Sequence, residues 1–348
     1  MNAPMTPYAT KPRCFRAGTL LVTLRGEVPA ESVRPGDLIL TLSGEGAPLK
    51  PVAWVGQVEV DLDTHPEPMA VRPVRIAAGA IEPGMPIRDL VVSPDHGISL
   101  EDDRGRRVLV PAHFLVNGAT ITRAPAEGRV TYVHVAVEGH EILMADGMAA
   151  ESLPPDADRS VFAGNVIALS GARPSPPEFA PAARVTRGVA PLRLGAEAHP
   201  LHARLMKVAE EAGFTLTRDP ALTAITPSGP AETIADADGD YVFLLPPRTD
   251  LIHLVSRRFV PAETDTAGGD QRVLGAALAQ IMLDGVEIDF AGPGFGAGFL
   301  PPEGEPGALW RWTLGDAELE IPPSDAEATL EVRVHLGWSR YWLEPTAR

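Results

Sequence analysis

Short runs of β-branched residues and leucine, each ended by glycine, proline or aspartate, fill the first half of the chain. They are Leu20–Leu24, Leu38–Leu42, Val52–Val60, Val71–Ile76, Leu90–Val92, Val108–Val110 and Val130–Val137. Such runs predict strands, and only Ala112–Val116, after Pro111, has a short helical pattern. The 33 glycines and 36 prolines are typical of a chain dense in turns. The pattern therefore predicts an all-β domain over residues 14–165, after a tail at residues 1–13.

The second half begins with a segment rich in proline and alanine, so residues 166–195 are predicted to be an extended linker. A helix is expected over Pro200–Ala212, because its apolar residues fall on one face and Gly213 follows. Strands are predicted again at Tyr241–Leu245, Leu251–Val255, Ala279–Leu283, Val286–Phe290, Leu309–Thr313, Glu318–Ile321 and Thr329–Leu336. Asp284-Gly285 predicts a tight hairpin turn, since both residues tolerate positive φ. Residues 196–348 are therefore expected to form a jelly-roll-like β-sandwich with one helix.

Charge and composition exclude several classes of function. The formal net charge of −16 argues against a nucleic-acid partner or an anionic membrane surface, because both require basic patches. No run of 18 apolar residues and no signal-peptide pattern is present, so no membrane span is expected. A cytoplasmic location is the default, with secretion that needs no cleaved N-terminal signal as the alternative.

The chain has a single cysteine, Cys14, at the start of its first strand-like segment. A lone cysteine excludes an internal disulfide, and it is commonly a buried, inert side chain. At the first position of the folded part, however, its thiol is placed to attack the preceding peptide bond, Arg13–Cys14. Both interpretations remain open from the residue alone.

Ser93-Pro94-Asp95-His96 follows a predicted strand, and its turn brings Ser93 and His96 to the same side of the chain. Attack by a thiol on a peptide bond needs an acid, because an amide nitrogen leaves only when protonated. His96 is a candidate for that acid, and Ser93 for the hydroxyl that orients the nitrogen. The alternative is a histidine whose ring is bonded only to the backbone of its own turn.

A later segment runs from Tyr132 to His140, with His134 on a predicted strand. His134 is a candidate to assist the second step of the reaction, or a histidine that stabilises a strand pair. His140 is expected to be a structural turn residue. The other histidines show no ligand-like spacing, and the glycine-rich loop at 292–299 lacks the Lys-Ser or Lys-Thr of a phosphate loop. We therefore expect no metal and no cofactor.

Together these segments resemble the Hint domain, the self-processing fold shared by hedgehog C-terminal domains and inteins. The resemblance covers residues 14–165 and is closer to bacterial Hint-type proteins that begin with Cys-Phe. Cys14, Gly18 and Thr19 match the opening of the family, and Ser93 to His96 match its Thr-x-x-His motif with serine in place of threonine. His134 falls where aspartate is common. The resemblance implies a pseudo-symmetric β horseshoe with Cys14, Ser93 and His96 at its centre.

The chain departs from inteins at the end of this region, which reads Glu151-Ser152 where inteins have His-Asn and a nucleophile. Without an asparagine amide to cyclise, splicing is not expected. The resemblance then implies thioester formation at Arg13–Cys14, followed by cleavage with water, a thiol or another small nucleophile. Such self-processing is autocatalytic and releases residues 1–13.

The alternative is a non-catalytic binding protein that recognises a glycan or a protein partner through its C-terminal β-sandwich. Aromatic residues are concentrated near the end of that region, at Trp310, Trp312, Trp338, Tyr341 and Trp342. An exposed row of these rings would favour sugar stacking. Packing in the core and at the edges of the sheet is the simpler expectation.

Overall fold

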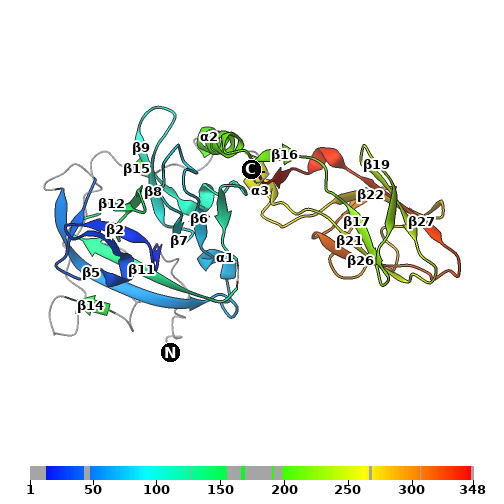
Figure 1. The fold of residues 1–348 in the computed structure, drawn as a ribbon, viewed down its shortest axis with the longest axis horizontal. Helices are drawn as coiled ribbons and strands as arrows, with labels where there is room; N and C mark the ends of the chain where they lie inside the picture. Colours follow the sequence, from blue (N-terminus) through cyan, green and yellow to red (C-terminus); the bar gives the residue numbers. More distant parts are fainter. Residues whose placement is uncertain are drawn as a thin grey trace. The chain divides into compact units, whose positions relative to one another are not determined.

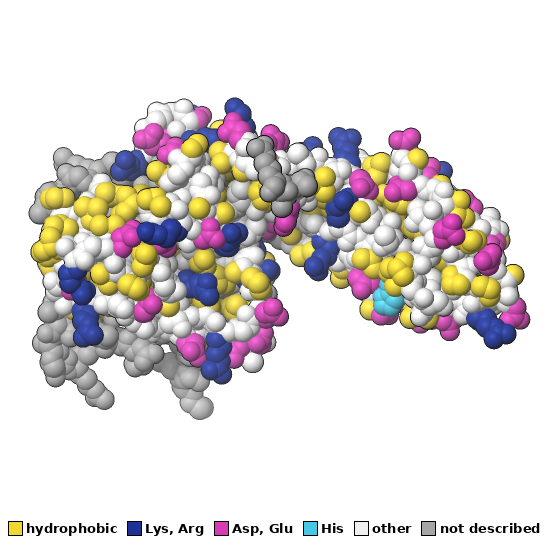
Figure 2. Space-filling model, in the orientation of Figure 1, with side chains coloured by type: hydrophobic (Ala, Val, Ile, Leu, Met, Phe, Trp, Pro, Cys, Tyr) yellow, Lys and Arg dark blue, Asp and Glu magenta, His cyan; other side chains and the backbone are white. Residues whose placement is uncertain are grey.

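The computed structural model describes residues 13–42, 48–125, 127–154, 166–168, 190–191, 198–265, 269–305 and 307–345. The chain divides into two compact units, Met1–Glu211 and Ala212–Arg348. Both are mainly β, as the sequence predicts. On the face drawn in Figure 2, charged side chains of both signs are interspersed with hydrophobic ones.

The first unit consists of a curled sheet with a few short helices. Its helical elements are η1 (Ala30–Ser32), α1 (Pro68–Val71), η2 (Ala112–Phe114) and α2 (Ala198–Glu211). Its strands are β1 (Phe15–Arg16), β2 (Leu20–Thr23), β3 (Gly26–Pro29), β4 (Leu38–Leu40), β5 (Leu49–Asp61), β6 (Val74–Ile76), β7 (Leu90–Val92), β8 (Gly97–Glu101), β9 (Arg107–Pro111), β10 (Ile121–Arg123), β11 (Arg129–Val137), β12 (Ile142–Ala145), β13 (Met148–Glu151), β14 (Val166–Ala168) and β15 (Ala190–Pro191).

The sheet order explains how distant segments meet at the start of the chain. It runs β10-β6-β7-β1-β11-β5-β4-β2-β12-β13-β8-β9-β15. The long antiparallel strands β5 and β11 lie side by side along most of their length (Figure 1). The short strand β1 is inserted between β7 and β11, with Phe15 opposite both Val92 and Val133. Cys14 therefore lies where the ends of two strands from far along the sequence converge.

Two features differ from the predicted strands of this unit. The run Val71–Ile76 is divided: α1 ends at Val71 and β6 begins at Val74. Pro73 accounts for the break, because proline restricts the residue before it and has no N–H to donate. In the predicted linker, the described residues form β14, which pairs with β5, and β15, which pairs with β9. The rest of the linker lies outside the described residues.

Helix α2 packs on the first unit, whereas the sequence predicts it in the second domain, over residues 196–348. Its residues Leu201 and Leu205 belong to the hydrophobic core of the first unit. The side-chain amide of Asn117 donates a hydrogen bond to the Leu205 carbonyl at 3.3 Å. The apolar face expected for this helix is therefore covered by the β-rich unit that precedes it, and the boundary between the units follows Glu211.

The second unit is built from two main sheets that share one hydrophobic core. Its helical elements are α3 (Pro261–Thr264) and η4 (Leu336–Trp338). Its strands are β16 (Thr215–Thr217), β17 (Thr223–Thr226), β18 (Gly229–Pro230), β19 (Glu232–Ala237), β20 (Asp240–Leu245), β21 (Leu251–Val255), β22 (Ala277–Leu283), β23 (Val286–Glu287), β24 (Glu303–Glu305), β25 (Ala308–Trp312), β26 (Asp316–Glu320), β27 (Ala328–Val334) and β28 (Tyr341–Leu343).

One sheet has the order β18-β17-β21-β26 and the other β19-β20-β27-β22-β25-β24. Leu254 from the first sheet and Phe243 and Val332 from the second are buried in the same cluster. This arrangement is the two-sheet sandwich expected from the sequence. The predicted hairpin is also confirmed, because Asp284 and Gly285 have φ values of 48° and 76° and join β22 to β23. No helix in the part of the chain that the structure describes is long and apolar enough to cross a membrane.

Candidate active site

The side chain of Cys14 is fully buried at the entrance to β1. It belongs to an apolar cluster that includes Trp54, Tyr132 and Leu153. Burial raises the pKa of the Cys14 thiol well above its ordinary value, because a thiolate loses its hydration there. The resting protein therefore holds this sulfur as a protonated thiol, and any reaction must include a step that removes the proton.

Ser93 forms two hydrogen bonds with the backbone of Cys14, one to its N–H and one to its carbonyl. The Cys14 N–H donates to the Ser93 Oγ at 2.7 Å, and the Ser93 N–H donates to the Cys14 carbonyl at 2.9 Å. The first contact is with the nitrogen of the Arg13–Cys14 peptide bond. The Ser93 hydroxyl thus lies at the amide nitrogen that would leave, the position predicted for an orienting group.

The turn after β7 brings His96 to the same peptide bond. The His96 N–H donates to the Ser93 carbonyl at 3.1 Å, and the His96 carbonyl accepts the Ala112 N–H at 2.9 Å. These bonds fix the turn between β7 and β8. The buried ring packs against Phe15, with 4.4 Å between the ring centroids.

Burial lowers the pKa of His96 to about 4, so the ring is neutral at neutral pH. The negative charge of Glu151 and a hydrogen bond to the backbone of Arg13 act in the opposite direction. Because a bond that raises this pKa favours the protonated ring, His96 faces the Arg13 carbonyl. The contact is not well aligned, since no described group meets either ring nitrogen in full hydrogen-bond geometry. Ser93 is therefore hydrogen-bonded to the nitrogen of the Arg13–Cys14 peptide bond, and the His96 ring lies near the carbonyl end of the same bond.

His134 is fully buried on β11, opposite Gly56 of β5. Its ring centroid lies 5.7 Å from that of His96. Burial is the main reason that the pKa of His134 falls well below the usual value, and the repulsion that a protonated His96 would exert lowers it further. A hydrogen bond to the backbone of Ser152 acts against these effects. The structure thus brings together all four predicted site residues: Cys14, Ser93, His96 and His134.

Glu151 and His140 also belong to this site, although no chemical role was predicted for either residue from the sequence. The Glu151 carboxylate is 3% exposed and accepts hydrogen bonds from the Gly97 N–H at 2.7 Å and from His140 Nε2 at 3.0 Å. Burial alone would raise the pKa of Glu151, but the His140 bond and nearby positive charges lower it overall. The sequence offers only a weak signal for Glu151, because a carboxylate that ends an apolar strand is commonly exposed to solvent.

Within the described ranges, no three His, Cys, Asp or Glu side chains are grouped so that they could hold a metal ion. The arrangement instead provides a thiol, a hydroxyl at the amide nitrogen, an imidazole at the carbonyl and a buried carboxylate nearby. These groups are suited to acyl transfer from nitrogen to sulfur.

The aromatic residues near the C-terminus do not form an exposed row. Trp312 and Tyr341 are only 7% and 1% exposed, within a hydrophobic cluster of the second unit. Trp338 is 47% exposed, and its ring meets the edge of Trp310 at 75° with 5.0 Å between centroids. The simpler expectation of core and edge packing fits this arrangement better than a surface for stacking sugar rings.

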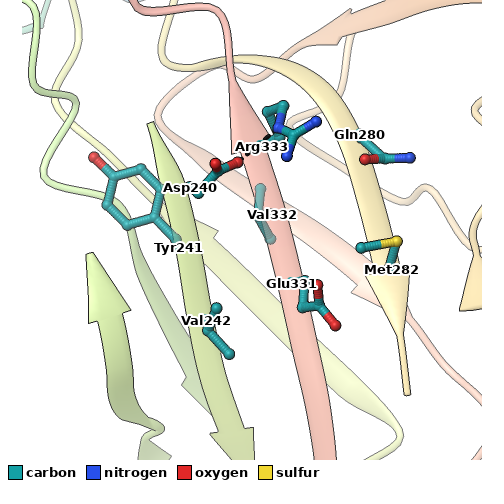
Figure 3. Close-up of a pocket in the computed structure, with 8 residues that line it drawn as sticks. All are labelled: Asp240, Tyr241, Val242, Gln280, Met282, Glu331, Val332 and Arg333. Carbon is teal, nitrogen blue, oxygen red and sulfur yellow. Dashed lines mark hydrogen bonds and ion pairs between the residues drawn. The ribbon is translucent and has the colours of Figure 1, made fainter. Parts of the chain in front are cut away.

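A shallow pocket lies on the face of β20, β27 and β22 in the second unit (Figure 3). It is lined by Asp240, Tyr241, Val242, Gln280, Met282, Glu331, Val332 and Arg333. Arg333 Nε and Asp240 Oδ1 form an ion pair at 2.7 Å, and the Tyr241 ring is buried in the core. Since its one arginine is already paired with a carboxylate of the same strands, we assign no ligand to this face.

Comparisons with known proteins concern the first unit. Residues 13–157 match the family model of the Hint domain. Among solved structures, a bacterial intein-like domain from Clostridium thermocellum is 18% identical, with 41% of this chain and 99% of that chain covered and a TM-score of 0.27. The gp41-1 intein is 12% identical, with coverages of 39% and 96% and a TM-score of 0.26. No curated protein matches the chain.

Proposed function

Because residues 13–157 form a Hint-type domain, we propose that the first unit cleaves its own Arg13–Cys14 peptide bond through a thioester. One observation carries the proposal: Ser93 contacts the nitrogen of this bond, while His96 faces its carbonyl. A cysteine buried only for packing would not require a hydroxyl and an imidazole on the two ends of the peptide bond before it.

In the first step, the Cys14 sulfur attacks the carbonyl carbon of Arg13. The new C–S bond forms, the C–N bond to Cys14 breaks, and the thiol proton is transferred to the departing nitrogen. The product is a thioester between Arg13 and the Cys14 side chain, with a free α-amino group on Cys14. In the second step, the oxygen of water or the sulfur of an added thiol forms a bond to the Arg13 carbonyl carbon, and the C–S bond to Cys14 breaks. The proton of the nucleophile is transferred to the Cys14 sulfur, and residues 1–13 leave as a carboxylic acid or as a thioester of the added thiol.

The contacts support distinct roles for the two neighbouring side chains. Ser93 accepts the hydrogen bond of the amide N–H through its Oγ and so keeps this nitrogen oriented as the C–N bond breaks. His96, neutral at its carbonyl, can donate an N–H to the oxyanion of the tetrahedral intermediate. A donor of this kind contributes roughly 3–4 kcal/mol in acyl-transfer enzymes. As a further part of the proposal, His96 relays the thiol proton to the departing nitrogen, and His134 assists the second step.

The burial of Cys14 indicates that the reaction is slow without an external nucleophile. A thiol whose pKa is raised well above its ordinary value supplies little thiolate at neutral pH. The first step is then an unfavourable equilibrium that an added small thiol would draw forward by removing the thioester.

The test is intact-mass analysis of the full chain incubated with and without dithiothreitol near pH 8.5. We expect loss of the mass of residues 1–13, faster with the thiol, and no loss for Cys14→Ala. Ser93→Ala should slow cleavage by about tenfold or more, since a lost hydrogen bond in a buried site costs roughly 1–3 kcal/mol. Ser99→Ala is the matched control, because Ser99 is also buried but its Oγ has no hydrogen-bond partner among the described residues.

The proposal is wrong if the wild-type chain keeps its full mass under these conditions. It is also wrong if cleavage proceeds equally in Cys14→Ala. If the mass of the product corresponds to a chain that begins at a residue other than Cys14, the cut was made by a contaminating protease and not by the proposed reaction.

A further inference from the structure

Glu151 is a buried carboxylate with an unusual set of partners. Its Oε1 accepts the Gly97 N–H at 2.7 Å, and its Oε2 accepts a hydrogen bond from His140 at 3.0 Å. The same Oε2 lies 3.7 Å from the guanidinium of Arg13. Three segments that are distant in the sequence therefore converge on one carboxylate beside the candidate active site.

Arg13 is the residue whose carbonyl would be attacked. Its side chain is 50% exposed, whereas that of Glu151 is 3% exposed. Glu151 is therefore enclosed by the fold, whereas Arg13 lies on the segment that would be released. This arrangement fits a recognition pocket and its substrate side chain, in which the buried group is preorganised for the more exposed one.

We propose that Glu151 is a specificity-determining residue that selects a basic side chain immediately before Cys14 and so holds the Arg13 carbonyl against His96. The inference rests on the proposed cleavage and names the class of acyl group that the site accepts. An acidic residue at position 13 would place two negatively charged carboxylates together, and they would repel each other. An uncharged residue would form no ion pair with Glu151, whose remaining partners are Gly97 and His140.

Gly97 provides independent support for a carboxylate held in a fixed position. A Cβ at Gly97 would lie 2.8 Å from both Cδ and Oε1 of Glu151. Only glycine lets the backbone approach this closely and donate its N–H. Gly97→Ala should therefore displace the carboxylate without removing its charge.

The experiment is a double-mutant cycle on the rate of thiol-induced cleavage, with the wild-type chain, Arg13→Gln, Glu151→Gln and the double variant. With Glu151 present, Arg13→Gln should slow cleavage about three- to tenfold, as expected for a partly exposed ion pair near the reacting bond. In Glu151→Gln, the same change at position 13 should alter the rate by less than about twofold. Arg13→Glu should be slower than Arg13→Gln when Glu151 is present.

Arg16→Gln is the matched control, because Arg16 is an exposed arginine on β1 that forms no ion pair with Glu151. It removes one positive charge close to Cys14 and should leave the cleavage rate within about twofold of the wild type. If Glu151→Gln fails to fold, Gly97→Ala takes its place and should likewise remove the dependence on position 13. Equal effects of Arg13→Gln in both backgrounds, or none in either, would overturn the inference.

A second readout separates failure of this inference from failure of the proposed function. The same four chains are built on Cys14→Ala, which cannot cleave, and their urea midpoints are compared. We expect Arg13→Gln to lower the midpoint only when Glu151 is present. If no chain cleaves but this coupling is found, the contact is real and the proposed cleavage is wrong. If cleavage occurs but neither cycle shows coupling, only the selection by Glu151 is wrong.

Discussion

The buried imidazole of His96 predicts that the first unit loses stability in mild acid. Burial lowers the pKa of His96 to about 4 in the folded protein, whereas a histidine in an unfolded chain titrates near 6.5. Between these values the unfolded chain binds the proton and the folded chain does not. The free energy of unfolding therefore falls as the pH falls from about 6.5 towards 4.

The magnitude follows from the size of the pKa difference. Each pH unit of displacement corresponds to about 1.4 kcal/mol, so His96 alone should remove about 2.5 kcal/mol of stability between pH 7 and pH 4.5. At pH 7 and above, both states carry a neutral ring and the contribution is close to zero. The loss is large for a domain whose total stability is about 5–15 kcal/mol.

The assay compares urea unfolding of the wild type and His96→Leu across this pH range, followed by pulsed hydrogen exchange in peptides from β5 and β11. His96→Leu should show a pH dependence weaker by about 2.5 kcal/mol, whatever its stability at pH 7. His65→Gln, a change at a partly exposed histidine after β5, should keep the wild-type dependence. If wild type and His96→Leu instead lose stability in parallel, the ring is not buried and neutral in the folded protein, and this prediction is wrong.

Three further predictions concern other parts of the chain. Ser93→Ala should lower the free energy of unfolding by about 1–3 kcal/mol, because it leaves the buried Cys14 N–H without its acceptor, while Ser99→Ala should be neutral or stabilising in the same urea titration. Cys14 should react with iodoacetamide far more slowly in the native protein than in 6 M guanidinium, since its side chain is fully buried and its pKa is raised; rapid native alkylation would contradict this. In the β22–β23 hairpin, Gly285→Ala should cost roughly 1 kcal/mol in thermal unfolding because φ is +76°, and Gly269→Ala, with no neighbour within 4 Å of the added Cβ, should cost clearly less.

Local sequence patterns were sufficient for much of the fold. Leu90–Val92 and Leu251–Val255 form strands with the predicted bounds, since short β-branched and leucine-rich runs between turn residues have few alternatives. Asp284-Gly285 forms the predicted turn because the requirement for positive φ is met by the two residues themselves. The three-residue spacing of Ser93 and His96 likewise predicted a turn, in which the His96 N–H donates to the Ser93 carbonyl.

Contacts between distant residues were decided only by the tertiary structure. The acidic Glu151 is buried because Gly97, His140 and Arg13 surround it, and none of these neighbours is marked by local spacing. Helix α2 was predicted from its own apolar face. Which unit covers this face was decided by contacts with Asn117 and with the hydrophobic core of the first unit. Secondary structure and turns follow from interactions within a few residues, whereas burial and pKa depend on which segments the sheet order brings together.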